Sequence, residues 1–406
     1  MRKILTYAVS ALALASCSSD SLVSDSPANT QAPIAFNAGQ KNITRAPFEK
    51  SFDNFRVWAY KYKTDASTGK ETSSAKVMDN YEVGYKTEVI SEVSKTVWYY
   101  EGLGSSENKQ VLHYWDYSYD NTNFYAYAPY NEDVTFDTGK KQIIVPASVN
   151  KAGFKKESEF VYAGKSVVKD NYNKPVELAF KRLGAIVNLK FYTDIKGYKV
   201  ELIDAKPEDP GSAIQATPAT YDDATKKYGN GTYYTSYEAL IDYSTDASNP
   251  TVKTNGTPVG TNLKFDLLDD NTVPAAVTDG STQNYLEPKT YYAVAQPTES
   301  ETGFTFHVSY KLTATDNSEV IVVRDARVFV PASVTDTTTD PATTTYIAAW
   351  QPNTKYTYTF KITTSTNGKT AEENIKLEDP SVPSDAGLYP IVFENITIED
   401  MTNVEY

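Results

Sequence analysis

Short runs of alternating apolar and polar residues recur along this chain, separated by clusters of Gly, Asn, Asp and Pro. In one run, Ala185, Val187, Leu189 and Phe191 occupy every second position. A period of two places these side chains on one face of a strand, which is typical of half-buried strands in antiparallel sheets. Long helical periodicity is absent. The chain is therefore predicted to be all-β and built from β-sandwiches.

Further strands are predicted at residues 32–38, 52–62, 96–100, 123–129, 142–146, 159–163, 176–180, 199–203, 263–267, 290–295, 303–310, 319–330, 355–363 and 390–401. The Asn- and Gly-rich stretches at 226–232 and 253–260 are predicted to be loops, because these residues disfavour strands. The chain length suits two or three domains. We predict two, and the polar run that ends at Lys174-Pro175 predicts the boundary between them. The expected domains are thus 46–174 and 175–406.

The first residues of the sequence are predicted to form an export signal. A basic start precedes an apolar stretch at residues 4–15, which is shorter than the ~20 apolar residues needed to span a bilayer. Residues 14–17 read Leu-Ala-Ser-Cys and match a bacterial lipobox, in which the cysteine is acylated and becomes the first mature residue. We predict a lipoprotein signal peptide at 1–16 and a lipid anchor on Cys17 in the outer membrane. An ordinary signal peptide with an incidental cysteine is the alternative.

Composition excludes several classes of function. Cys17 is the only cysteine, so after acylation no thiol remains for a disulfide, a metal site or a nucleophile. The formal net charge of −13 argues against nucleic acid as a partner, because phosphate recognition relies on Lys and Arg. The two histidines, His113 and His307, lie in strand-like runs and are interpreted as packed or edge residues. We predict no enzyme activity and no cofactor.

Motifs that carry chemistry are few. No Gly-rich phosphate loop, serine nucleophile elbow or paired-histidine metal motif occurs. The acidic stretches at 116–121 and 266–271 lack the spacing of a calcium loop, so we interpret them as loop residues rather than as cation sites. A glycosidase needs only two carboxylates, but nothing in this sequence singles out a pair. No metal site is predicted.

Two segments near the ends of the chain suggest processing and pairing. Arg45 lies in a polar stretch between two predicted strands, where backbone can enter a protease cleft, and a cut after it would detach the strand at 33–38. A plain linker arginine is the alternative. The tail at 390–401 alternates apolar and polar residues. It is either the last strand of its own domain, which general grounds favour, or a strand offered to another chain.

Several segments can be read together. They are the lipobox Cys17, Pro33–Phe36 with Thr44–Ala46, Phe55–Tyr60, Tyr114–Trp115 with Phe124–Pro129, Tyr291–Pro297, Trp350–Phe360 and the ending Ile391–Phe393. In this order and spacing they resemble the fimbrillin family, the subunits of type V pili of Bacteroidota. The resemblance spans the whole chain. It implies two tandem antiparallel β-sandwich (transthyretin-like) domains after a lipoprotein signal peptide, and assembly by protease-triggered strand exchange.

The resemblance also implies roles for particular residues. Arg45–Ala46 would be the site cut by an arginine-specific or trypsin-like protease. Residues 17–45 would then be a tether with a removable strand, whose Ile34 and Phe36 leave a groove in the N-terminal domain. The C-terminal strand of a neighbouring subunit would fill that groove by β-augmentation. Its anchoring residues would be Ile391, Phe393, Ile396 and Ile398.

The resulting hypothesis is a structural shaft subunit of a cell-surface pilus, with a role in adhesion or biofilm formation. Its expected partners are other copies of itself, other pilus subunits, the processing protease and a host or bacterial adhesion receptor. One alternative within the family is an uncleaved surface lipoprotein, either a pilus anchor or a tip. Another is a glycan-binding lipoprotein that uses exposed aromatic residues. The candidates for such contacts are Tyr99, Tyr100, Trp115 and Tyr117.

Overall fold

The computed structural model describes residues 32–38, 52–90, 93–105, 108–153, 159–203, 214–222, 227–230, 233–261, 263–265, 267–278, 281–295, 303–336, 338, 341–363 and 391–400. Within these ranges the chain is built from strands, and the one helical element is a 3-10 turn, η2 (Lys169–Asn171). No helix of the described residues has the length and apolarity needed to cross a membrane. The prediction of an all-β fold is confirmed.

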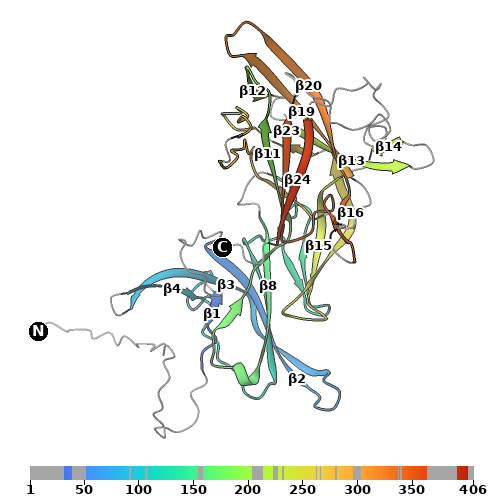
Figure 1. Ribbon diagram of the computed structural model, residues 1–406. Helices are drawn as coiled ribbons and strands as arrows, with labels where there is room; N and C mark the ends of the chain where they lie inside the picture. Colours follow the sequence, from blue (N-terminus) through green and yellow to red (C-terminus); the bar gives the residue numbers. More distant parts are fainter. Residues whose placement is uncertain are drawn as a thin grey trace, which may run out of the picture.

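A six-stranded antiparallel sheet forms the centre of the N-terminal half (Figure 1). In spatial order its strands are β10 (Lys181–Arg182), β8 (Val161–Val168), β5 (Asn121–Ala128), β2 (Asn54–Thr64), β3 (Glu71–Ile90) and β4 (Val93–Tyr99). Phe124 and Ala126 of β5 belong to a core on one face, and Tyr125 and Tyr127 to a core on the other. Because both faces are covered, β5 is buried along almost its whole length.

A second sheet covers the face that carries Tyr125 and Tyr127. Its strands, in spatial order, are β16 (Thr251–Thr261), β15 (Tyr233–Asp242), β7 (Gln142–Val145) and β6 (Thr135–Asp137). The antiparallel register sets Ala239 opposite Val145 and Ile241 opposite Ile143. A hairpin from beyond residue 175 therefore completes a layer of the N-terminal half.

The opposite face, with Phe124 and Ala126, is covered by short elements. Strand β1 (Phe36–Ala38) pairs with β9 (Val176–Leu178), and Phe36 lies opposite Val176. This pairing is parallel, unlike the antiparallel sheets that the sequence predicted. The core beneath β1 also includes Leu178 and Phe180.

Two further sheets form the C-terminal half. One has the order β18 (Tyr291–Ala293), β11 (Ala185–Thr193), β23 (Thr354–Ile362) and β24 (Ile391–Asp400). The other has the order β12 (Tyr198–Leu202), β19 (Gly303–Ala314), β13 (Ile214–Asp222) and β14 (Lys227–Asn230), with β17 (Leu263–Phe265) beside β13 and β20 (Val320–Val330) beside β19. Strands β21 (Ser333–Asp336) and β22 (Thr343–Tyr346) make a separate hairpin.

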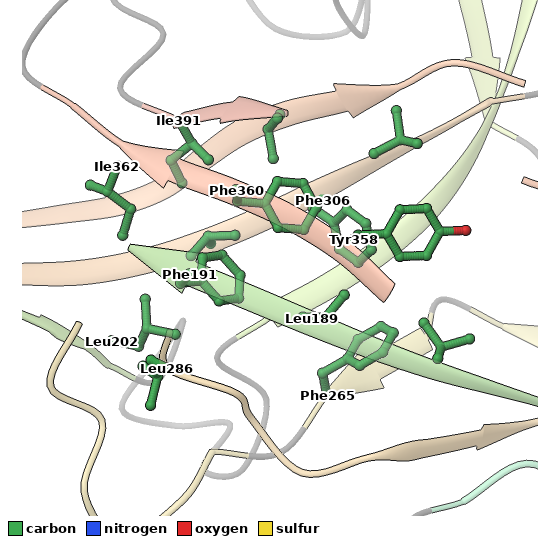
Figure 2. Packing of buried hydrophobic residues seen from close by; sticks show 14 of the residues in the cluster. Leu189, Phe191, Leu202, Phe265, Leu286, Phe306, Tyr358, Phe360, Ile362 and Ile391 are labelled. Atoms are coloured by element: carbon green, nitrogen blue, oxygen red, sulfur yellow. The ribbon is translucent and has the colours of Figure 1, made fainter. Parts of the chain in front are cut away.

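The apolar core of this half lies where side chains of these strands meet, as Figure 2 shows for Leu189, Phe191, Phe306 and Phe360. Every second residue of β11 is buried, as its alternation predicted. Strands β11 and β23 run parallel, with Leu189 opposite Tyr358. The sheet is therefore mixed rather than purely antiparallel.

Two loop predictions are wrong. Residues 226–232 contain β14, and residues 253–260 lie within β16. Backbone pairing with β13 and β15 explains the difference, because ladder hydrogen bonds do not depend on side chains of high β-propensity.

The two halves meet where the chain passes from β10 to β11. A Cβ at Gly184 would lie 2.3 Å from the carbonyl oxygen of Ala293, so only glycine fits there. The backbone N–H of Asn353 donates to the carbonyl of Gly184 at 2.8 Å. The division at 174/175 stays a prediction, but residues 176–180 and 233–242 pack with the N-terminal half.

Candidate functional site

The segment 32–38 is paired on both sides in the N-terminal half. On one side, the N–H of Ile34 donates to the carbonyl oxygen of His113 at 2.8 Å. On the other side, the N–H of Val176 donates to the carbonyl oxygen of Ala35 at 2.7 Å. The segment is thus a strand inserted between two neighbours rather than a tail on the surface.

The two predicted anchors of this segment are deeply buried. Ile34 is 2% exposed and Phe36 is 6% exposed. The Phe36 ring meets those of Phe55, Tyr100 and Phe124 edge-on, with centroids 5.7, 5.8 and 5.7 Å away. Edge-to-face contacts are favoured between aromatic rings, and full burial of such a side chain contributes ~1.5–3 kcal/mol. Ile34 and Phe36 therefore fill the core on this face of the sheet.

Tyr100 holds the backbone of the inserted strand. Its hydroxyl donates to the carbonyl oxygen of Ile34 at 2.9 Å and accepts from the N–H of His113 at 3.1 Å. Burial raises the pKa of Tyr100 to about 12, because the low-dielectric interior disfavours the phenolate. The hydroxyl therefore keeps its proton, and with it this hydrogen bond, at neutral pH.

The histidines and acidic stretches can now be placed. His113 is packed, as predicted: its Nε2 lies 3.0 Å from the hydroxyl of Tyr81, and burial lowers its pKa. His307 lies in β19, but its side chain is outside the described part of the structure. Asp116 is held by Lys61 at 2.6 Å and by Ser118, which lower its pKa to about 2.

The second acidic stretch also uses its polar groups locally. Asp270 accepts a hydrogen bond from the N–H of Thr272 at 3.0 Å, and Asp266 lies outside the described residues. Across the described ranges, no group of His, Cys, Asp and Glu residues is arranged to hold a metal ion. The carboxylates of Asp116 and Asp270 therefore stabilise loops and neighbouring strands.

The prediction of an exposed aromatic set is wrong for two of its four residues. Trp115 is fully buried and stacks on Tyr172 with centroids 4.4 Å apart, and Tyr100 is 3% exposed. Tyr117 is exposed, and its ring lies edge-on against Tyr172. Buried rings cannot stack on a sugar, so these four residues do not form the aromatic platform that a glycan-binding surface needs.

The predicted donor residues lie on β24, which pairs antiparallel with β23. Each of the four lies opposite a large side chain of β23, and all of these side chains lie on one face of the sheet. The opposed pairs are Ile391 with Ile362, Phe393 with Phe360, Ile396 with Tyr358, and Ile398 with Tyr356. Figure 2 shows Ile391 beside Ile362 at one end of this core. Ile391 is 2% exposed, whereas the other three are half-buried.

A β-bulge brings these four side chains to one face. Phe393 and Ile396 are three residues apart, which would place them on opposite faces of a regular strand. The register of β24 against β23 shifts between Phe393 and Asn395, so Glu394 has no opposite residue. A bulge of one extra residue restores the alternation. The carboxylate of Glu394 accepts a hydrogen bond from the hydroxyl of Tyr192 at 2.6 Å.

Strand β24 is also the edge of its sheet. Among the described residues it pairs with β23 alone, so one side of its backbone carries no ladder. Phe393 lies 6.0 Å from Phe360 and 6.4 Å from Tyr358, measured between ring centroids, and remains half-buried. It is therefore less enclosed than Phe36, which three rings surround.

Comparison with protein families identifies the family of the chain that carries β1 and β24. A family model described as fimbrillin-like matches residues 43–378, well over half of the chain. The chain belongs to the fimbrillin-like family. A second model, the prokaryotic membrane lipoprotein lipid attachment site, matches residues 1–18. Comparison with curated protein sequences finds no significant match.

The solved structures that match this chain in a structure comparison include two that are described as fimbrial. One is a fimbrial protein from Bacteroides vulgatus, which is 14% identical and has a TM-score of 0.49; the match covers 91% of this fimbrillin-like chain and 99% of that chain. Another is the fimbrial anchor protein Mfa2 from Porphyromonas gingivalis, which is 8% identical and has a TM-score of 0.31; the match covers 91% of this chain and 98% of that chain.

The family and the lipid attachment site make this fimbrillin-like protein a surface lipoprotein of the pilus or adhesion kind, a structural class rather than an enzymatic one. Pilus subunits of this kind assemble with other subunits. Of the predicted site residues, Ile34 and Phe36 lie together in the N-terminal core, and the four donor residues lie together on β24. Cys17, Arg45 and Ala46 lie outside the described residues.

Proposed function

We propose that this protein is a shaft subunit of a cell-surface pilus, exported as an outer-membrane lipoprotein through Cys17 and polymerised by strand exchange after cleavage at Arg45–Ala46. The observation that carries the proposal is the burial of Ile34 and Phe36 inside the N-terminal half, on a segment that precedes Arg45. A cut after Arg45 would separate this inserted strand from the domain whose core it fills.

Loss of the inserted strand would leave a groove that favours a new occupant. The carbonyl of His113 would lose the N–H of Ile34, and the N–H of Val176 would lose the carbonyl of Ala35. An unsatisfied buried polar group costs ~1–3 kcal/mol. The space vacated by Phe36 would add a cavity penalty, because the surrounding core collapses only in part. Any extended segment that supplies backbone partners and an apolar side chain would stabilise the cleaved protein.

Strand β24 supplies both requirements. Its four apolar side chains lie on one face, and one side of its backbone carries no ladder in the described part of the chain. A tail from one subunit that enters the groove of the next makes a head-to-tail contact, which propagates into a filament. The presence of both a candidate cut site and a tail in one chain supports a shaft position. The filament would serve adhesion or biofilm formation through a host or bacterial receptor.

An uncleaved anchor or tip subunit is the second candidate. It is favoured by the ladder between β24 and β23, in which nine residues of β24 have opposite residues in their own domain. In that case β24 would remain paired with β23 of its own chain, and the inserted strand at 32–38 would remain a permanent part of the fold.

Limited proteolysis distinguishes the two candidates. The chain from residue 18 onward is treated with an arginine-specific protease, its new N-terminus is sequenced, and the product is run unboiled on a denaturing gel. Strand exchange predicts a terminus at Ala46 and a ladder of multimers, and an Arg45→Gln control that stays monomeric. A monomer after cleavage at Arg45 would overturn the shaft assignment and leave an anchor or tip.

A further inference from the structure

The inserted strand and the C-terminal strand begin with nearly the same sequence. Residues 33–36 read Pro-Ile-Ala-Phe, and residues 390–393 read Pro-Ile-Val-Phe. No other proline in the 406-residue chain is followed by isoleucine. The repeat therefore coincides with the segment that fills the groove and the segment proposed to replace it.

The structure gives the repeated residues similar surroundings. Ile34 and Ile391 are both almost fully buried. Phe36 packs against three aromatic rings in the N-terminal half, and Phe393 packs against two in the C-terminal half. In each segment the residue between isoleucine and phenylalanine is half-buried. The two segments thus present the same pattern of side chains to a core.

We propose that the tail of a second copy enters the groove in the register and chain direction of β1, with Ile391 in the place of Ile34 and Phe393 in the place of Phe36. This inference rests on the proposed strand exchange. In that register the carbonyl of Ile391 accepts a hydrogen bond from the hydroxyl of Tyr100. The carbonyl of Val392 accepts a hydrogen bond from the N–H of Val176. The tail then runs parallel to β9, as β1 does.

This register improves the packing of the exchanged strand. Phe393 moves from a half-buried position between two rings into the enclosure that surrounds Phe36. Val392 replaces the smaller Ala35 and adds apolar area, which strengthens the hydrophobic contribution. Glu394 takes the place of Asn37, and both residues are polar and exposed at their present sites. The match therefore holds on the outward face as well as on the face that meets the core.

Disulfide trapping tests the register residue by residue. Asn37 lies opposite Glu177 in the ladder between β1 and β9, and both are exposed. In the proposed register, Glu394 of one copy lies opposite Glu177 of another, within the Cα separation that a disulfide can bridge. The chain from residue 18 onward has no native cysteine. A Glu177→Cys protein and a Glu394→Cys protein are mixed, cut after Arg45 and mildly oxidised.

Two controls accompany this pair. Asn37→Cys combined with Glu177→Cys in one uncut chain should give an internal disulfide, which shows that the position is competent. Val392→Cys points to the same outward face as Glu394→Cys but lies about 6.5 Å along the strand. It should give little covalent dimer with Glu177→Cys under the same conditions.

The outcomes separate the register from strand exchange itself. A covalent dimer of Glu394→Cys with Glu177→Cys, reversed by reductant and absent without cleavage, supports the proposal. Multimers on an unboiled gel without this link, or with a preferred link from Val392→Cys, overturn the register and leave strand exchange intact. Absence of multimers overturns strand exchange and this register with it.

Discussion

The hydroxyl of Tyr100 donates a hydrogen bond of 2.9 Å to the backbone carbonyl of Ile34, a residue 66 positions earlier in the chain. The contact is made to the backbone and not to the side chain of the inserted strand. A different strand can therefore receive the same hydrogen bond, provided that its apolar side chains fit the core. In the uncut protein, Tyr100 helps to hold the segment that precedes Arg45.

Phe36 is expected to matter most for the stability of the uncut chain. Phe36→Ala should lower the free energy of unfolding by ~3–5 kcal/mol, because it removes a buried ring and leaves a cavity among three others. Asn37→Ala, at the exposed neighbour, should change it by less than ~0.5 kcal/mol. Urea unfolding of both variants provides the comparison. Equal effects would mean that the inserted strand does not support the core.

The bulge at Glu394 makes an unusual deletion tolerable. Without Glu394, the apolar residues of β24 would alternate regularly, so the cost should stay within ~1 kcal/mol, mainly from exposed contacts with Tyr192 and Lys361. Deletion of Val392 should instead turn Ile391 away from the core and cost ~1.5–3 kcal/mol. Denaturant unfolding of the two deletions tests this. A Glu394 deletion as damaging as the Val392 deletion would contradict the role of the bulge.

Alkaline pH should unfold this protein steeply. Burial raises the pKa of several tyrosines to about 12; they are Tyr100, Tyr162, Tyr237 and Tyr310. Between the unfolded pKa of about 10 and this value, the unfolded chain releases protons that the folded chain retains. Stability present below pH 10 should then fall by ~1.4 kcal/mol per pH unit for each such tyrosine. The free energy of unfolding, measured at pH 8, 10 and 11, should show this decrease. Tyr310→Phe should make the decrease with pH less steep. A flat profile would contradict it.

The ion pair between Glu159 and Arg182 is almost fully buried where the two halves meet. Arg182→Met should cost ~3–5 kcal/mol, because it leaves the Glu159 carboxylate buried without its main counter-charge. The double variant Arg182→Met/Glu159→Leu should recover most of the loss. Lys76→Met, which breaks an exposed pair with Asp79, should leave the free energy of unfolding almost unchanged, because solvent screens that pair. Thermal and urea unfolding of these variants measures the costs. Equal losses of stability for the buried and the exposed pair would contradict the importance of the buried pair.

Alternation predicted strands well where one face is buried and the other is exposed. Strand β11 is the best case, because every second side chain from Ala185 onward meets the core. Strand β3 escaped prediction, since its long stretch is held by backbone ladders to β2 and β4 rather than by an apolar pattern. Strand β16 lies where composition predicts a loop, and its backbone ladder to β15 explains the difference in the same way. Pairing between distant strands leaves little mark on local composition.

The candidate site was predictable in its apolar residues and not in its polar ones. Ile34, Phe36 and the four donor residues are large and apolar in short patterned runs, and the resemblance to fimbrillins is what implies their roles. The sequence predicts Tyr100 among exposed aromatic residues, yet it lies in the core and its hydroxyl donates a hydrogen bond to the backbone carbonyl of Ile34, 66 positions earlier. The bulge did leave a signal, namely the spacing of three between Phe393 and Ile396 in an otherwise alternating run.

Release of the inserted strand tests strand exchange most directly. The chain from residue 18 onward is cut after Arg45, and the amount of free fragment 18–45 is measured by mass spectrometry as multimers form. Strand exchange predicts that one fragment leaves for each subunit that joins. An Ile391→Asp/Phe393→Asp variant should keep its fragment and remain monomeric after the same cut. Multimers that retain fragment 18–45 would contradict the replacement of the N-terminal strand by the C-terminal strand of another copy.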